Sequence, residues 1–159
     1  MMTNRFIFGF LLIAIIAWPV NAAAQAYPVD DSASQVLGPG LLKMRWDSAL
    51  PKPGQASTIT GHVVVLVRLD VSPWRGRHAR IYQKLPSVPA GAINARWTSN
   101  GTLLSGALRD GERTLVYSGV INSDRLEDTF RLSIQADGER VERPQALAFS
   151  FEIELEPQP

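Results

Sequence analysis

The sequence predicts an all-β protein, a single antiparallel β-sandwich, immunoglobulin-like or pilin-like, of about eight strands. Apolar residues after position 40 recur at every second position in short segments, and no segment shows a convincing helical period. Turn-forming residues separate these segments about every 8–12 residues, as in sandwiches and barrels. The chain has no cysteine, so apolar burial rather than disulfides must hold the domain together.

The first 26 residues have the three-part pattern of an export signal. Arg5 is followed by an almost wholly apolar stretch at 6–17, and then by small residues ending in Ala24-Gln25-Ala26. The competing interpretation is a membrane anchor, but this apolar stretch ends before the roughly 20 residues that a spanning helix needs. We therefore expect a cleaved signal peptide at 1–26, a periplasmic or extracellular (cell-surface) location, and no membrane span after cleavage.

The cleavage site gives a first testable prediction. The small-x-small rule places cleavage before Tyr27, with cleavage before Gln25 as the alternative. N-terminal sequencing of the exported protein should therefore return Tyr27 or Gln25. Recovery of an intact Met1 in a membrane fraction would contradict the signal peptide.

The mature chain is close to neutral. The whole sequence has 16 Lys and Arg against 15 Asp and Glu, and removing Arg5 leaves 15 of each. This balance gives no reason to expect nucleic acid as a partner, because phosphate binding needs a basic excess or patch. The absence of cysteine also removes thiol nucleophiles and thiolate metal sites.

The predicted sandwich covers 41–156 and follows an exposed, polar N-terminal tail at 27–40. Its strongest strand is 58–72, whose middle is apolar on both faces and is therefore expected to be covered on both sides. The last strand, 146–155, alternates most cleanly, and one of its faces is wholly apolar. That face consists of Leu147, Phe149, Phe151, Ile153 and Leu155.

Three dipeptides predict hairpin turns, because Asn-Gly and Asp-Gly tolerate the positive φ angles of two-residue turns. They are Asn100-Gly101, Asp110-Gly111 and Asp137-Gly138. A single helical turn is expected only at 124–128.

No catalytic pattern emerges, so we expect no enzyme activity. The chain has two histidines, His62 and His78, and Asp70 lies eight residues along the same strand from His62, beyond hydrogen-bond reach. No nucleophile, zinc-protease or phosphate-loop motif occurs. We expect no cofactor.

Two groups of carboxylates are candidates for a catalytic or metal-binding site. Asp124, Glu127 and Asp128 suggest a loop or a calcium-binding loop, but Arg125 interrupts the set, and we expect no metal. The second group alternates along the last strand, as a solvated outer face should. It consists of Glu152, Glu154 and Glu156.

The candidate ligand-binding residues are Trp74, Arg75 and Arg77, in the chain's one local concentration of positive charge. An aromatic ring beside arginines can hold carboxylates, sulfates or a sugar face. The competing interpretation is a solubilising turn with Trp74 folded onto the end of the sandwich.

Three features together resemble subunits or accessory proteins of cysteine-free bacterial chaperone–usher fimbriae. They are the export signal, the segments 115–121 (Leu-Val-Tyr-Ser-Gly-Val-Ile) and 126–134, and the alternating last strand. The resemblance implies a sandwich completed by a neighbour's strand, with other envelope or fimbrial proteins as partners. The tail lacks a long alternating apolar run, since Val29, Val36 and Leu37 are sparse, which favours a minor or accessory subunit.

The expected function is therefore a structural or assembly role in the bacterial envelope, without catalysis. The alternative is a periplasmic carbohydrate- or polyanion-binding module that uses Trp74, Arg75 and Arg77, with a glycan as its ligand. Whether the sandwich is complete or needs a donor strand stays open at this point.

Overall fold

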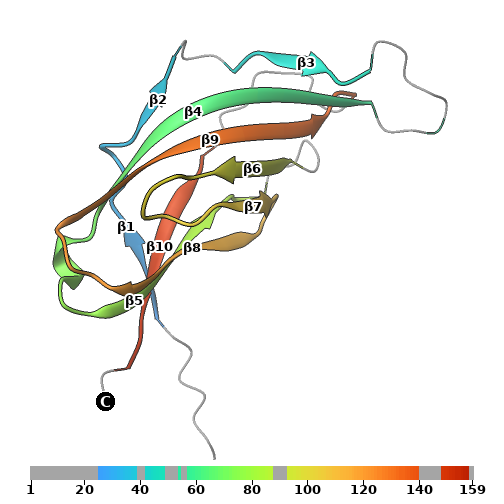
Figure 1. Ribbon diagram of the computed structural model, residues 1–159. Coiled ribbons are helices and arrows are strands. Elements are labelled where there is room, and N and C mark those ends of the chain that lie inside the picture. The colour runs from blue at the N-terminus through green and yellow to red at the C-terminus, as the bar shows by residue number, and fades with distance from the viewer. Residues whose placement is uncertain are drawn as a thin grey trace, which may run out of the picture.

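The computed structural model describes residues 25–38, 42–48, 54, 57–87, 93–139 and 148–157 (Figure 1). These residues form two antiparallel sheets, which confirms the predicted all-β sandwich, with ten strands in place of about eight. Sheet A has the order β1 (Ala26–Val29), β10 (Ser150–Leu155), β5 (His78–Lys84) and β8 (Arg113–Val120). Sheet B has the order β2 (Gln35–Leu37), β4 (Thr58–Asp70), β9 (Arg125–Asp137), β6 (Asn94–Thr98) and β7 (Gly106–Arg109), and β3 (Met44–Trp46) also pairs with β4.

Strands β4 and β9 form the longest ladder, and they run side by side through the whole of sheet B (Figure 1). Their register extends from Thr58 opposite Asp137 to Asp70 opposite Arg125. Side chains alternate along each strand, so every second side chain points into the sandwich. On the outer face, Val64 is only half-buried, so the middle of β4 is not covered on both sides.

The core lies between the two sheets. Phe130 of β9 stacks on Trp97 of β6, with ring centroids 5.7 Å apart. Phe151 and Ile153 of β10 are buried on the facing sheet, as their alternation predicts, whereas Leu147 lies outside the described residues. Burying each large apolar side chain contributes roughly 1.5–3 kcal/mol, so this shared interior is the main source of stability.

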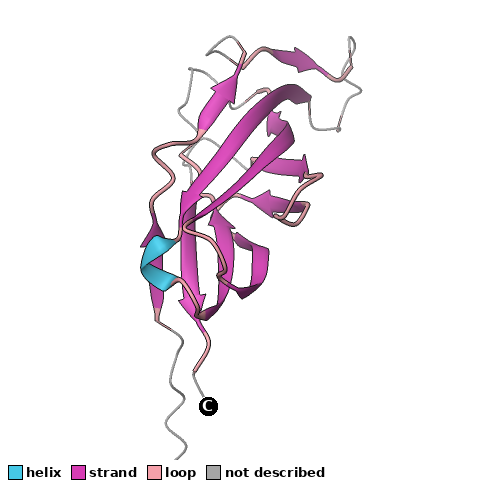
Figure 2. Cartoon of the chain, turned by 60° about the vertical axis from the view of Figure 1, so that its left-hand side comes forward, coloured by secondary structure: helices cyan, strands magenta, loops and turns pink. Residues whose placement is uncertain are grey.

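One short 3-10 helix, η1 (Ser72–Trp74), joins β4 to β5 at one end of the sandwich (Figure 2). Pro73 suits it, because a proline at the first turn of a helix needs no hydrogen-bond donor. No helix in the described part of the chain is long and apolar enough to cross a membrane.

Strand pairing begins at Ala26, the last residue of the predicted signal peptide, and continues into the segment 27–40 that the sequence predicts as an exposed tail. Strand β1 pairs with β10, and β2 pairs with β4. Val29 is buried in the core, although its neighbours in β1 are exposed. The structure has strands here although the sequence predicts a tail, because edge strands are held by backbone hydrogen bonds, which need no long apolar pattern. Residues 1–24 of the predicted signal peptide lie outside the described residues.

The three turn dipeptides behave differently from the predicted hairpins. Asn100-Gly101 lies in a longer loop at 99–105, because β7 pairs with β6 only from Gly106 opposite Trp97. Asp110-Gly111 does make a turn, with Gly111 at φ +75°, but it leads from β7 of sheet B to β8 of sheet A. Asp137-Gly138 ends β9, and the residues from 140, where the second strand of this hairpin would lie, are outside the described residues.

The helical turn predicted at 124–128 is wrong, because β9 already begins at Arg125. In a strand, Glu127 and Asp128 point to opposite faces. Glu127 lies on the outer face, between the cations of Arg68 and Arg125. Asp128 lies on the inner face and is buried. Pairing with β4 therefore outweighs the local helical preference of this segment.

Candidate functional site

The structure places Trp74, Arg75 and Arg77 in one turn but gives each a different environment. Trp74 is half-buried and packs against the core. Arg75 forms an ion pair with Asp124 at 2.9 Å, and both side chains remain more than 60 % exposed (62% and 65%). The Nε atom of Arg77 is buried without a hydrogen-bond partner. The turn therefore does not present a ring and two free guanidinium groups to one ligand.

The two histidines lie on different sheets. His78 of β5 contacts Glu156 through Nδ1 at 2.9 Å. His62 of β4 is exposed and lies opposite Ser133 of β9. Within the described ranges, no three histidine, aspartate or glutamate side chains gather as a metal site would require.

The outer face of sheet A carries a strip of ion pairs. Arg113 of β8 contacts Glu152 at 2.7 Å and Glu154 at 2.6 Å, and its guanidinium lies 4.4 Å from the centre of the Tyr82 ring. Hydrogen bonds to Glu152 and Glu154 raise the pKa of Arg113 further above its ordinary value. Glu156 contacts Arg80 at 2.8 Å. The three glutamates are therefore paired with cations, rather than only solvated as expected.

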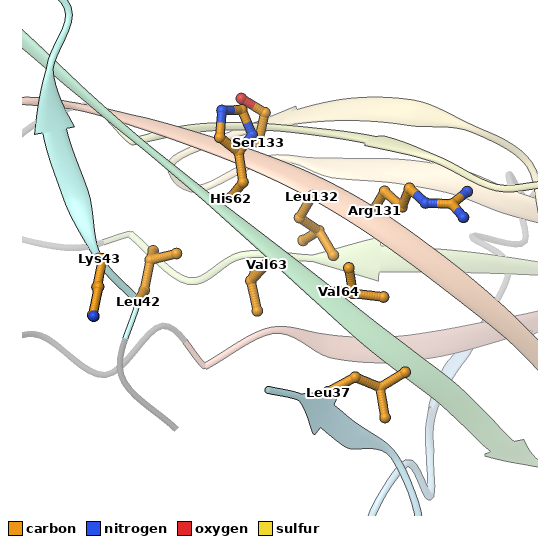
Figure 3. Close-up of a pocket in the computed structure, with 9 residues that line it drawn as sticks. All are labelled: Leu37, Leu42, Lys43, His62, Val63, Val64, Arg131, Leu132 and Ser133. Carbon is orange, nitrogen blue, oxygen red and sulfur yellow. The ribbon is translucent and has the colours of Figure 1, made fainter. Parts of the chain in front are cut away.

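The edge of sheet B is discontinuous, because two three-residue strands share one side of β4. Strand β2 pairs with 64–66, and β3 pairs with 59–61 (Figure 1). Between these two pairings, His62 and Val63 of β4 have no strand partner on this side among the described residues. A hollow of ≈ 450 Å³ lies at this interruption, and Leu37 and Leu42 line it (Figure 3).

Backbone direction alternates along β4 and identifies which groups face this edge. Arg68 donates its N–H to Ser34 Oγ at 2.9 Å, and Asp70 donates its N–H to the carbonyl of Asp30 at 2.9 Å. Even-numbered residues of β4 therefore direct their backbone groups toward β2 and β3. His62 is also even-numbered, so its N–H and C=O point toward the gap between β2 and β3.

Exposed apolar side chains concentrate at the sheet edges. Six large apolar side chains of the described residues are exposed, and five of them lie on the edge strands β1, β2, β3 and β8. The five are Tyr27, Val36, Leu37, Trp46 and Val120, and the sixth, Leu104, lies in the loop at 99–105. Val36 and Trp46 are the most exposed, at 54% and 56%.

Sequence reasoning missed Val36 and Leu37 as exposed residues of an edge strand, since two apolar residues in a polar segment are too few to predict a strand. It also missed Asp128, whose buried carboxylate accepts hydrogen bonds from Ser99 Oγ at 2.6 Å and from the Leu103 N–H at 2.8 Å. The signal for Asp128 was its even position in a strand whose other even positions are apolar.

The fold and these surfaces define a class, an all-β sandwich whose most distinctive features are its edges and its charged outer faces. In comparisons with known proteins, no protein-family model matches the chain, and no curated protein matches it significantly.

Proposed function

We propose that this chain is an exported, non-catalytic β-sandwich protein that assembles with other proteins of the bacterial envelope by strand addition, as a fimbria-associated minor or accessory subunit. The observation that supports this proposal best is the concentration of exposed apolar side chains on edge strands. An edge strand offers unpaired backbone groups to another chain, and apolar side chains there make the contact favourable.

The edge formed by β2 and β3 is the best candidate for this contact. It carries Val36, Leu37 and Trp46, whereas β1 and β8 carry one exposed apolar residue each. Leu37 lies opposite Val64, so its backbone groups point to β4. The N–H of Val36 therefore points away from β4, toward the free edge, where a partner strand would accept its hydrogen bond.

The substitution Val36→Pro tests this edge. Proline removes the outward N–H and adds bulk at the edge, while no ladder bond to β4 is lost, and proline is tolerated on edge strands. A synthetic alternating apolar peptide that binds the processed wild-type protein should raise its melting temperature, since a ligand of the folded state stabilises it by mass action. We expect Val36→Pro to abolish this rise and to change the melting temperature without peptide by only a few degrees.

Two further results make the test decisive. Val36→Thr keeps the N–H, so it should retain part of the peptide effect and serves as the matched control. A processed protein that stays monomeric, melts cooperatively at high temperature and ignores every alternating peptide would contradict strand addition at this edge.

The alternative function, a carbohydrate- or polyanion-binding module, is supported by a different observation. Several arginines on the outer face of sheet B take part in none of the ion pairs among the described residues, in contrast to Arg75 and the cations of sheet A.

A further inference from the structure

Charge is segregated between the two outer faces of the sandwich, although the whole chain is close to neutral. The cations on the outer face of sheet A pair with Glu152 and Glu154 of β10 and with Glu156, which follows it. On the outer face of sheet B, four arginines take part in none of the ion pairs that the described residues form. They are Arg45, Arg96, Arg109 and Arg131, and all four are exposed.

The strand register brings these residues into one arc. Arg131 lies opposite both Val64 of β4 and Thr98 of β6, and Arg96 lies one row away on β6. Strands lie about 4.8 Å apart and residues on one face about 6.7 Å apart, so Arg131 and Arg96 are about 8 Å apart at the backbone. Arg109 occupies the next row on β7, one strand further.

The arc continues on the other side of Arg131. His62 lies on β4 one row from Arg131, and Arg45 lies on β3 one row further, opposite Thr60. Five neighbouring strands thus contribute one basic residue each. We call this set the arginine arc, and it consists of Arg45, His62, Arg131, Arg96 and Arg109.

Two hollows meet at the centre of the arc. One, of ≈ 450 Å³, is lined in part by Lys43, His62 and Arg131 (Figure 3). The other, of ≈ 440 Å³, contains Arg131, Asn100 and Glu127. Nη1 of Arg131 donates to the side-chain oxygen of Asn100 at 3.2 Å, with the amide oriented to satisfy both of its groups. The first hollow is also lined by the inward residues Val63 and Leu132, so it is not confined to the outer face, whereas the second lies beside Arg131 on that face and gives it relief.

Carboxylates border the arc on two sides, and Glu127 and Asp128 also line the hollow beside Arg131. Asp47 accepts hydrogen bonds from Thr58 and Gln135, and Asp137 lies opposite Thr58. On the other side, Glu127 is already paired with Arg68 and Arg125. The middle of the face therefore keeps its positive charge.

We propose that the arginine arc binds a linear acidic polysaccharide, a chain of uronic-acid type that lies across sheet B. Guanidinium groups bind carboxylates in two-point contacts. Hydroxyl and amide side chains lie between the arginines and suit sugar hydroxyls. These polar residues are Asn94, Thr98 and Ser133, whereas Thr60 and Gln135 on the same face already hydrogen-bond Asp47.

Two other classes of anion fit this face less well. A peptide strand would need free backbone groups, but β9 and β6, which carry Arg131 and Arg96, already pair on both sides. Single-stranded nucleic acid stacks its bases on aromatic rings, and the strand residues on this face include no Phe, Tyr or Trp.

Calorimetric titration of the processed protein with an oligogalacturonate of defined length tests the proposal. We expect binding that weakens as salt rises, because exposed charges are screened. Arg96→Ala and Arg131→Ala should each weaken binding about tenfold, as the loss of one charged hydrogen-bond pair predicts. The double variant Arg96→Glu/Arg131→Glu should abolish binding of the oligogalacturonate. Both side chains are exposed and take part in none of the ion pairs among the described residues, so thermal melts of these variants should match the wild type.

Control variants separate this face from other surfaces. Arg80→Ala, on sheet A, and Val36→Pro, at the proposed assembly edge, should leave glycan affinity unchanged. Three results would overturn the arc: no binding of oligogalacturonate at low salt, equal loss of binding in the Arg75→Ala/Arg77→Ala variant, or tighter binding of poly-glutamate or single-stranded DNA than of the glycan. None of these results bears on strand addition, which the peptide melts test separately.

Discussion

Phe151→Ala is expected to lower the free energy of unfolding by about 3–5 kcal/mol, the range for phenylalanine truncation in a packed core. Phe151 is only 5% exposed and lies in the middle of sheet A, opposite Val29 on β1 and Gln83 on β5. It also lines a small hollow of ≈ 170 Å³ between the sheets, with Phe130 and Phe149. The truncation therefore enlarges an existing hollow, which the rigid sheets cannot close.

Urea denaturation of the processed protein measures this effect. Domains of this size unfold with a total of about 5–15 kcal/mol, so the variant should unfold at a much lower urea concentration or lack a native baseline. Leu104→Ala is the matched control, since Leu104 is 47% exposed and should cost less than about 0.5 kcal/mol. A Phe151 variant as stable as the control would show that β10 does not contribute to the core.

The long strands were predictable because burial repeats at every second residue. In β9 and β10, every inward position of the described residues is buried or half-buried, and strict alternation in the sequence reflects this directly. The short edge strands β1 and β2 were not predictable. They are held by backbone pairing, and their side chains carry no long apolar pattern.

Turn dipeptides predicted where the chain reverses but not which strands it joins. Asp110-Gly111 makes the expected turn, yet the strands on either side belong to different sheets. The two strands separate because β7 forms its backbone hydrogen bonds with β6, whereas β8 forms its own with β5. The local sequence contains no information on that choice.

The candidate sites depend on contacts between residues far apart in sequence. Arg75 and Asp124 are 49 residues apart, and their ion pair removes the free cation that the basic turn suggests. The arginine arc is invisible in the sequence for the same reason. Arg96 and Arg131 become neighbours only through the register of β6 and β9.

The buried carboxylate of Asp128 holds the loop at 99–105 against sheet B. Its Oδ2 atom accepts hydrogen bonds from Ser99 Oγ at 2.6 Å and from the backbone N–H of Leu103 at 2.8 Å, while Oδ1 accepts from the N–H of Thr129 at 2.6 Å. A Cβ atom on Gly101 would lie 2.6 Å from the same Oδ2, so only glycine allows the loop to approach this closely. Asp128 is therefore the link between the loop and the sandwich.

Asp128→Ala should lower the free energy of unfolding by about 2–4 kcal/mol, because the buried N–H of Leu103 loses its acceptor and charge-assisted hydrogen bonds are lost. Asp128→Asn should cost less, since the amide oxygen can still accept from Ser99 and Leu103. Glu127→Ala, at the adjacent exposed position, should cost less than about 1 kcal/mol. Urea denaturation ranks the three variants, and hydrogen exchange reports on the loop itself: the Leu103 amide should exchange much faster in Asp128→Ala, ahead of global unfolding. A Leu103 amide that stays as protected as in the wild type would mean that packing of the buried Leu103 side chain, rather than the carboxylate, holds the loop in place.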